Sequence, residues 1–351
     1  MKVLLTGHRG YIGSVLAPML QERGHNVVGL DSDLFRACTF AGKLAEMRSL
    51  DKDSRDVTIE DLTVEHMRGL DAVIHLAGLS NDPLGDYRPE LTGEINFVAS
   101  VKLAKLAKAA GVPRYLFASS CSNYGAAGQD FLAEDSPFNP VTPYGESKVQ
   151  VEHAVRPMAD STFSPTFLRA STAYGLSPRI RFDLVVNNLT AWAFTTGEVH
   201  LKSDGSPWRP IVHVEDIARA YVAVLEADRD VVHNEAFNVG TTAENYQIRE
   251  IAELVRDVVP GSKVGFATGA APDKRNYRVD CNYIARKLRN FKPQWTCRRG
   301  IEQLYDAYRS VGLTLEEFEG EKFMRIAHIK KLIREGELDE SLRRTRAAHA
   351  A

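Results

Sequence analysis

The chain has 351 residues, 44% of them hydrophobic and 26% charged, so it is long enough to bury a sizeable core. Its formal net charge is only −2, which gives no basic field for nucleic acid, and no apolar run reaches the roughly 18 residues that span a bilayer. The four cysteines are scattered without a CxxC pair, which favours reduced thiols and a cytoplasmic location over a disulfide framework or a metal site.

Short apolar runs alternate with helical patterns over the first two-fifths of the chain. The predicted strands cover residues 2–5, 26–30, 71–76 and 114–118. The predicted helices cover residues 13–23 and 94–110, with apolar residues at helical spacing and a glycine after each. Strands that alternate with helices in this way indicate an α/β fold, a doubly wound parallel sheet of the Rossmann type with helices on both faces.

The pattern changes at about residue 166, where longer loops punctuated by proline and glycine begin. Residues 211–226 predict one more strand and helix, which we expect to belong to the main sheet. Residues 247–259 predict an amphipathic helix. Residues 313–346 predict a mostly charged helical tail whose alternating charges favour a solvated or partner-facing helix.

Three glycines lie between the first predicted strand and the first predicted helix, at Gly7, Gly10 and Gly13. Glycines permit a sharp turn and let backbone N–H groups approach a pyrophosphate at the positive end of the helix. Asp31 closes the second strand, where a carboxylate can accept both hydroxyls of an adenosine ribose and would repel a 2′-phosphate. The sequence therefore favours NAD over NADP, although Arg36 nearby could soften that preference.

Tyr144 and Lys148 are four residues apart, so on a helix they project from the same side. An ammonium near a phenol favours the phenolate, and such a pair can take or return a hydroxyl proton while hydride passes to a nicotinamide. Ser119 and Ser120 follow a predicted strand at the same edge of the sheet, where a hydroxyl could bond the reacting oxygen or simply cap the strand end.

Seven motifs together resemble one family, the extended short-chain dehydrogenase/reductases, and within it the NAD-dependent sugar-nucleotide epimerase/dehydratase group. They lie at residues 6–13, 75–78, 119–125, 143–148, 168–169, 174–175 and 209–216. The resemblance covers roughly residues 1–310. It implies a NAD-binding domain over 1–165 plus about 208–245, a smaller α/β substrate-binding region over about 166–207 and 246–310, and a helical tail over 311–351.

The resemblance also implies roles for individual residues. Tyr144 would be the base, Lys148 its partner and a ribose ligand, and Ser120 the third catalytic group. The implied NAD contacts are Gly7, Gly10, Tyr11, Ile12, Gly13, Asp31, Asp53, Ser54, Leu76, Ala77, Gly78, Tyr144 and Lys148. The implied contacts to a nucleotide-diphosphate sugar are Ser120, Cys121, Ser122, Asn188, Arg209 and Arg275, the arginines because a guanidinium fork suits phosphate geometry.

The resemblance favours a nucleotide-sugar epimerase that works through a transient keto sugar. A 4-ketoreductase of a deoxysugar pathway is the alternative, and a non-catalytic nucleotide-binding protein is a third possibility. Dehydration ranks low, because Cys121 and Ser122 stand where the family's 4,6-dehydratases carry Asp and Glu. Cys121 could shuttle a proton in a 3- or 5-epimerisation or serve only in packing. The family implies a homodimer formed through the helices at 94–110 and 144–158.

Overall fold

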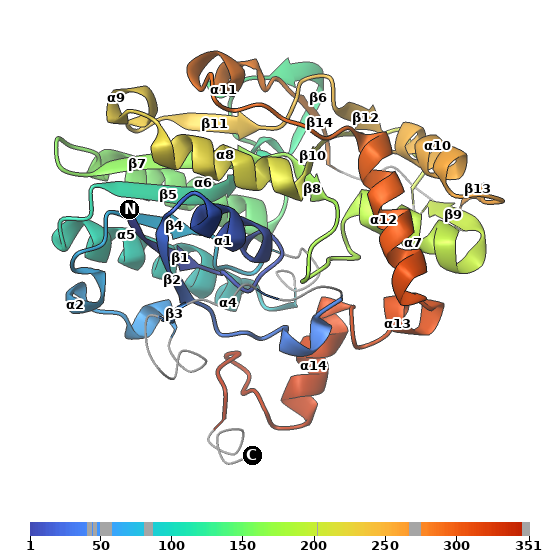
Figure 1. The fold of residues 1–351 in the computed structure, drawn as a ribbon, viewed down its shortest axis with the longest axis horizontal. Helices are drawn as coiled ribbons and strands as arrows, with labels where there is room; N and C mark the ends of the chain where they lie inside the picture. The colour runs from blue at the N-terminus through green and yellow to red at the C-terminus, as the bar shows by residue number, and fades with distance from the viewer. Residues whose placement is uncertain are drawn as a thin grey trace.

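In this computed structural model the described residues are 1–40, 44, 48–49, 58–80, 87–201, 203–266 and 275–345. Their centre is a sheet of seven parallel strands in the order β11-β7-β5-β4-β1-β2-β3 (Figure 1). The strands are β1 (Lys2–Thr6), β2 (Asn26–Leu30), β3 (Arg48–Ser49), β4 (Ala72–His75), β5 (Arg114–Ser120), β7 (Ser164–Ala170) and β11 (Ala236–Val239). This arrangement confirms the doubly wound α/β fold.

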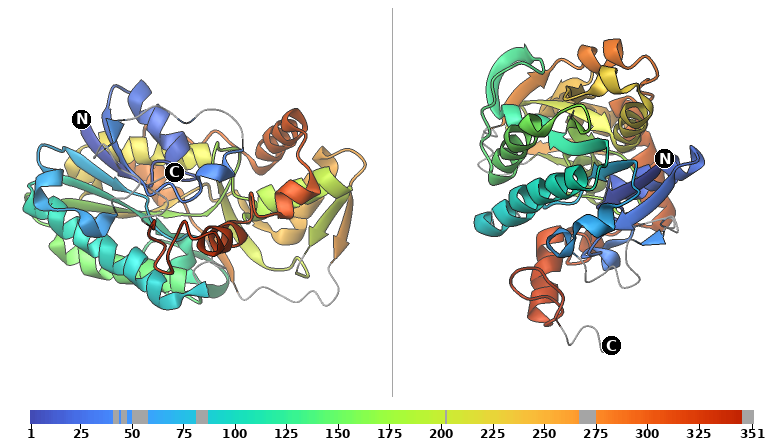
Figure 2. Two further views of the ribbon diagram at one scale, coloured as in Figure 1. Left: turned by 90° about the horizontal axis from the view of Figure 1, so that it is seen from below. Right: turned by 90° about the vertical axis from the view of Figure 1, so that its left-hand side faces the viewer.

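Helices cover both faces of this sheet (Figure 2). On one face α1 (Gly13–Glu22) and α8 (Val214–Glu226) bury Leu16, Leu20 and Val224 against the strands. On the other face α5 (Ala99–Ala109) and α6 (Pro143–Val155) bury Leu103 and Val151. Short elements flank them: α2 (Val64–Met67), α4 (Pro89–Gly93) and the 3-10 turns η1 (Arg36–Cys38), η2 (Ile59–Asp61), η4 (Cys121–Tyr124) and η5 (Arg156–Met158).

A smaller α/β region lies beside the carboxyl ends of the strands (Figure 1). It contains three small sheets, formed by β8 (Thr172–Tyr174) with β10 (Trp208–His213) and β12 (Asn245–Gln247), by β9 (Glu198–Leu201) with β13 (Lys263–Phe266), and by β6 (Ala126–Leu132) with β14 (Asn276–Val279). Its helices are α7 (Val185–Thr196), α10 (Ile248–Val258) and α12 (Cys297–Val311), with α9 (Arg229–Val232) and α11 (Asn282–Lys287) nearer the main sheet.

The strand predicted at the start of residues 211–226 is β10, and the prediction that it joins the main sheet was wrong. It pairs with β8 and β12, while its helix α8 does pack on the main sheet. The reason is that β10 serves two cores: Val212 packs into the main core and Ile211 into the core of the smaller region. The main-sheet edge position is taken by β11 instead.

The predicted change at residue 166 falls inside β7, a strand of the main sheet. The division into a NAD-binding domain and a substrate-binding region stays a prediction. In the described part of the chain no helix is long and apolar enough to cross a membrane. All four cysteines are buried free thiols.

For the tail, predicted as a solvated or partner-facing helix, the solvated alternative was wrong. The C-terminal residues form two short helices, α13 (Leu315–Glu319) and α14 (Arg325–Arg334), followed by turns that fold back on themselves through one antiparallel bridge between Leu338 and Arg344. Their apolar side chains, among them Phe318, Ile329 and Leu342, are buried against the body of the protein. A few apolar residues at helical spacing are enough to anchor a segment whose remaining side chains are charged.

Candidate active site

The turn between β1 and α1 is built on glycine because neighbouring backbone lies too close for any side chain. Gly7 has a φ of +73°, and a Cβ there would lie 2.8 Å from the backbone nitrogen of Ala77. A Cβ on Gly13, the first residue of α1, would lie 2.1 Å from the carbonyl oxygen of Gly7. The positive end of α1 is thereby open to an anion, which fits the pyrophosphate of a dinucleotide.

This turn forms one end of a cavity of about 1120 Å³. The cavity brings together sixteen of the residues predicted from the sequence: Gly7, Gly10, Tyr11, Ile12, Gly13, Asp31, Leu76, Ala77, Gly78, Ser120, Ser122, Tyr144, Lys148, Asn188, Arg209 and Arg275. Asp53 and Ser54 lie outside the described residues, so their predicted adenine contact stays a prediction. A cavity of this size exceeds the usual range for one drug-sized ligand and suits two ligands in contact.

Asp31 follows β2 directly and is held in a fixed orientation at the cavity. One of its carboxylate oxygens accepts a hydrogen bond from the backbone of Arg9 and the other from the backbone of Asp33, both at 2.8 Å. Each oxygen keeps a second lone pair, so the carboxylate can still accept ribose hydroxyls.

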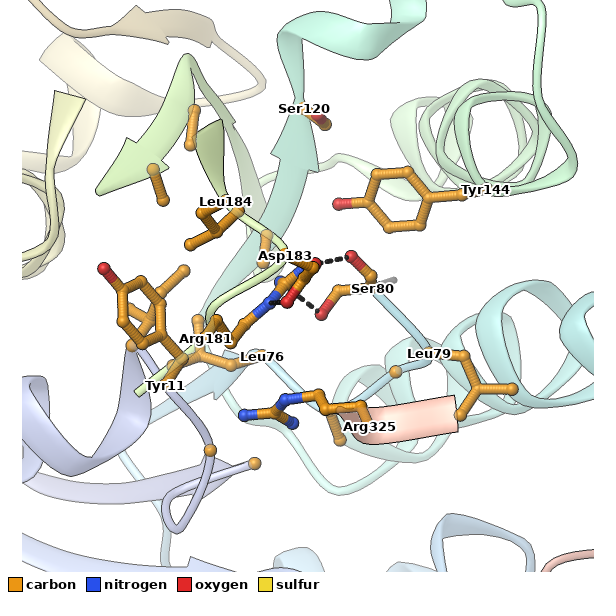
Figure 3. Close-up of a pocket in the computed structure, with 18 of the residues that line it drawn as sticks. Tyr11, Leu76, Leu79, Ser80, Ser120, Tyr144, Arg181, Asp183, Leu184 and Arg325 are labelled. Carbon is orange, nitrogen blue, oxygen red and sulfur yellow. Dashed lines mark hydrogen bonds and ion pairs between the residues drawn. The ribbon is translucent and has the colours of Figure 1, made fainter. Parts of the chain in front are cut away.

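The helix α6 carries Tyr144 and Lys148, and both line the cavity. Figure 3 shows the ring of Tyr144 extending from this helix. Thr142 caps the helix, its hydroxyl accepting the N–H of Gly145 at 3.2 Å. Lys148 is 4% exposed, and its Nζ lies 5.4 Å from the ring centre of Tyr144 and 4.7 Å from that of Phe117. Burial lowers the pKa of Lys148 to about 8, so the ammonium remains mostly charged at neutral pH.

Asn96 fixes the strand-end loop against this helix, and the sequence patterns did not reveal it. Its amide oxygen accepts the N–H of Leu79 at 2.7 Å and its amide nitrogen donates to the Leu79 carbonyl at 2.9 Å. The same nitrogen reaches the Ser147 hydroxyl at 3.4 Å. Asn96 lies in a π-helical turn, η3 (Glu94–Val98), which is a feature that often marks functional sites.

The two serines at the end of β5 have separate tasks. Ser119 also lines the cavity, but its hydroxyl is already used, because it donates to the buried carboxylate of Glu152 at 2.6 Å. Ser120 lines the cavity, and its oxygen accepts both the N–H and the hydroxyl of Ser122, at 3.1 and 2.8 Å. Because its oxygen is already accepting, the Ser120 hydroxyl proton is available to donate to a bound ligand.

Cys121 is the one described residue of the predicted substrate set that the structure does not bring to the cavity. It is fully buried, and its thiol donates to the carbonyl of Arg169 at 3.1 Å. Burial raises the pKa of the Cys121 thiol to about 12. The prediction that Cys121 contacts the substrate is therefore corrected: η4 turns its side chain into the core.

At the far end of the cavity lie the predicted diphosphate ligands. Asn188, on α7, donates to the Phe182 carbonyl at 2.8 Å and lines the cavity, whereas its neighbour Asn187 is fully buried and supports the Gly175 backbone. Arg209, from β10, is 5% exposed and donates to the carbonyl of Arg275, so the two arginines meet at one place.

Between these ends lies a cluster that the sequence did not reveal (Figure 3). Arg181 pairs with Asp183 at 2.6 Å and donates to the hydroxyl and the carbonyl of Ser80, at 3.0 and 2.9 Å. It crosses from the smaller region to the main sheet and lies beside the cavity face of Tyr144. The Arg-x-Asp spacing in a loop is too common a signal to find it by sequence alone.

Residues 3–240 match the model of the NAD dependent epimerase/dehydratase family. The UDP-glucose 4-epimerase of Corynebacterium glutamicum is 29% identical over 74% of this chain and 80% of its own length. The enzyme of the same name from Bacillus subtilis is 28% identical over 87% of this chain and 94% of its own. The solved structure of MoeE5 with UDP-glucuronic acid and NAD has a TM-score of 0.74 and 26% identity, covering 89% of this chain and all of that one.

Proposed function

Because the chain belongs to the NAD dependent epimerase/dehydratase family, we propose that it is a nucleotide-sugar epimerase that acts through a transient keto sugar. The observation that carries the proposal is that the glycine turn, the Tyr144 side chain and Lys148 line the same cavity. NAD is the cofactor of the family, and when bound it supplies reversible hydride transfer to and from a sugar carbon.

The residues of the cavity divide the remaining chemistry. Tyr144 takes the proton of a sugar hydroxyl and later returns it, and the Lys148 ammonium favours the phenolate that does so. Ser120 donates a hydrogen bond from its free hydroxyl to the reacting oxygen. This hydrogen bond strengthens as the oxygen gains negative charge. Asn188, Arg209 and Arg275 hold the diphosphate, so the sugar can present either face at the same place.

Net reduction and dehydration have less support. An epimerase consumes no external reductant, so its cofactor can stay bound through the cycle. The dehydratase alternative needs an acid and a base beside Ser120, but the next two residues are the buried Cys121 and the hydroxyl of Ser122.

The test is to incubate the protein with NAD and a panel of UDP-, GDP-, CDP- and dTDP-sugars and to determine the product stereochemistry by NMR. UDP-glucose and UDP-galactose come first, because the relatives above are named UDP-glucose 4-epimerases. Tyr144→Phe should abolish turnover while NAD affinity stays nearly unchanged, and Tyr87→Phe, an exposed phenol outside the cavity, is the matched control. Net NADH oxidation without an epimer would refute the epimerase in favour of a ketoreductase.

The proposal includes a homodimer in the cytoplasm. Val98 on η3 is 58% exposed, with the half-buried Phe97 and Val101 beside it, and this apolar strip supports pairing through η3, α5 and α6. Four free buried thiols support a reducing compartment. Sedimentation tests the dimer: Val98→Lys should give a monomer, and a wild-type monomer would refute it.

A further inference from the structure

The C-terminal segment closes one side of the cavity. Met324, Arg325, Ser341, Leu342 and Arg343 line it together with the glycine turn, although the family model ends at residue 240. In Figure 1 α14 lies below the edge of the sheet that carries β2 and β3, separate from α12. Residues that no family motif covers therefore contribute to the wall of the cofactor site.

This segment is anchored at several points. Leu332, Leu338 and Leu342 pack in one apolar cluster with Leu79, which follows β4. Beyond α14, the guanidinium of Arg343 pairs with Glu60 and Asp61 and donates to Thr58 at 3.2 Å, so the segment reaches the loop before α2. Arg88 pairs with Glu340 at 2.6 Å.

Arg325 is the feature of this segment that points to a ligand. It is 9% exposed, and in the described part of the chain it forms no ion pair with a carboxylate. Its guanidinium donates to the Arg179 carbonyl at a long 3.3 Å, and its Nε is buried without a partner in the described part of the chain. Arg179 and Arg181 nearby each have a carboxylate of their own, Asp33 and Asp183.

The electrostatic surroundings make this burial costly. The guanidinium lies 4.1 Å from the centre of the Phe35 ring, with two other cations near it. Burial first, and then the charge of Arg181, lower the pKa of Arg325 to about 10, against the weaker opposing charge of Asp183. A buried guanidinium without a full set of acceptors is stabilised by an anion, and a diphosphate fits its planar fork.

The position of Arg325 favours the pyrophosphate of the dinucleotide over the diphosphate of the substrate. Figure 3 shows its guanidinium reaching from α14 toward the side of the cavity where Tyr11 and Leu76 lie. It lines the same cavity as Tyr11, which directly follows Gly10. Arg325 begins α14, so the positive end of that helix lies at the same place.

We propose that Arg325 binds the pyrophosphate of NAD opposite the glycine turn, and that residues 321–345 form a strap that holds the cofactor in place. The proposal rests on the NAD site and not on the epimerase reaction. Loss of the predicted epimerisation with intact NAD effects would therefore refute the proposed function and leave this inference standing.

The test compares Arg325→Met with Arg334→Met, an exposed arginine on the same helix that pairs with Glu321. Isothermal titration of the full chain with NAD and, separately, with UDP distinguishes the two diphosphates that the cavity could hold. Arg325→Met should weaken NAD binding roughly 10- to 100-fold, as expected for losing a charge-assisted bidentate contact, and leave UDP binding unchanged. Arg334→Met should change neither.

Two results would overturn the assignment. Unchanged NAD affinity in Arg325→Met would show that Arg325 does not contact NAD. A loss of UDP affinity alone would assign Arg325 to the substrate site. Thermal unfolding without ligand separates a structural role: the variant should unfold at the same or a higher temperature, because an unpaired buried cation is gone. If Arg325→Met unfolds at a lower temperature without ligand, and NAD raises its unfolding temperature as much as that of the wild type, Arg325 serves only in packing.

The strap itself is tested by limited trypsin digestion read by mass spectrometry. Cleavage after Arg343 and Arg344 should slow in the presence of saturating NAD and not in the presence of UDP. Equal cleavage rates with and without NAD would refute the strap, whatever the result for Arg325.

Discussion

Replacing Lys148 by Met should stabilise the ligand-free protein while it removes activity. Burial lowers the pKa of Lys148 from 10.5 to about 8, and at roughly 1.4 kcal/mol per pH unit this difference corresponds to about 3 kcal/mol. The ammonium also faces the rings of Phe117 and Tyr144, and the loss of those contacts should lower the free energy of unfolding by about 1 kcal/mol. We therefore expect a net gain of about 2 kcal/mol in the free energy of unfolding at pH 7.

The destabilisation by Lys148 depends on pH. The folded-state pKa lies below the unfolded one, so below pH 8 Lys148 is charged in both states and its burial destabilises the fold fully. Between pH 8 and 10.5 the folded protein loses the proton first, so the destabilisation fades.

Urea unfolding at pH 7 and at pH 10 measures this difference. Lys105→Met on α5, an exposed position, is the control and should change stability by no more than about 0.5 kcal/mol. The reasoning fails if Lys148→Met is no more stable than wild type at pH 7, or if its advantage stays the same at pH 10.

Three further outcomes are expected. Arg169→Met should cost about 3–5 kcal/mol in urea unfolding, because the fully buried Glu152 loses its partner at 2.7 Å and keeps only the half-buried Arg156 at 3.5 Å; a loss under 1 kcal/mol would contradict this. Gly13→Ala should weaken NAD binding at least tenfold by titration, because its Cβ would overlap the Gly7 carbonyl and force the turn open; wild-type affinity would contradict the cradle. Ser120→Ala should lower kcat roughly 100-fold with KM little changed, since its hydroxyl acts on the developing charge, and a purely KM effect would reassign it to binding.

The parts of the site that the sequence predicts are those in which chemistry and local structure share a short segment. The glycine turn occupies the seven residues from Gly7 to Gly13, and Tyr144 and Lys148 lie one turn apart on a single helix. In both cases the helical or turn geometry alone brings the groups together, so residue type and spacing are sufficient.

The parts that the sequence does not predict depend on contacts between distant segments. Asn96 reaches Leu79 and Ser147, and nothing in its own helix indicates those partners. The strand β10 has an ordinary apolar pattern, which specifies burial but not which strand it pairs with. Cys121 follows Ser120 directly, yet one 3-10 turn separates a cavity-lining hydroxyl from a buried thiol.

Buried charge separates structural from functional groups in this protein. Away from the cavity, buried charges are paired: Glu152 with Arg169, and Asp33 with Arg179. At the cavity, Lys148 and Arg325 are both buried, and neither has a carboxylate partner in the described ranges. An unpaired buried cation is too costly to be retained for folding alone, so both positions indicate a ligand that supplies the missing negative charge or uses the positive one. The loss in the free energy of unfolding that these two side chains cause in the ligand-free protein should accordingly be offset when NAD binds. Arg325→Met should therefore reduce the stabilisation by NAD more than the same substitution at any exposed arginine of this segment.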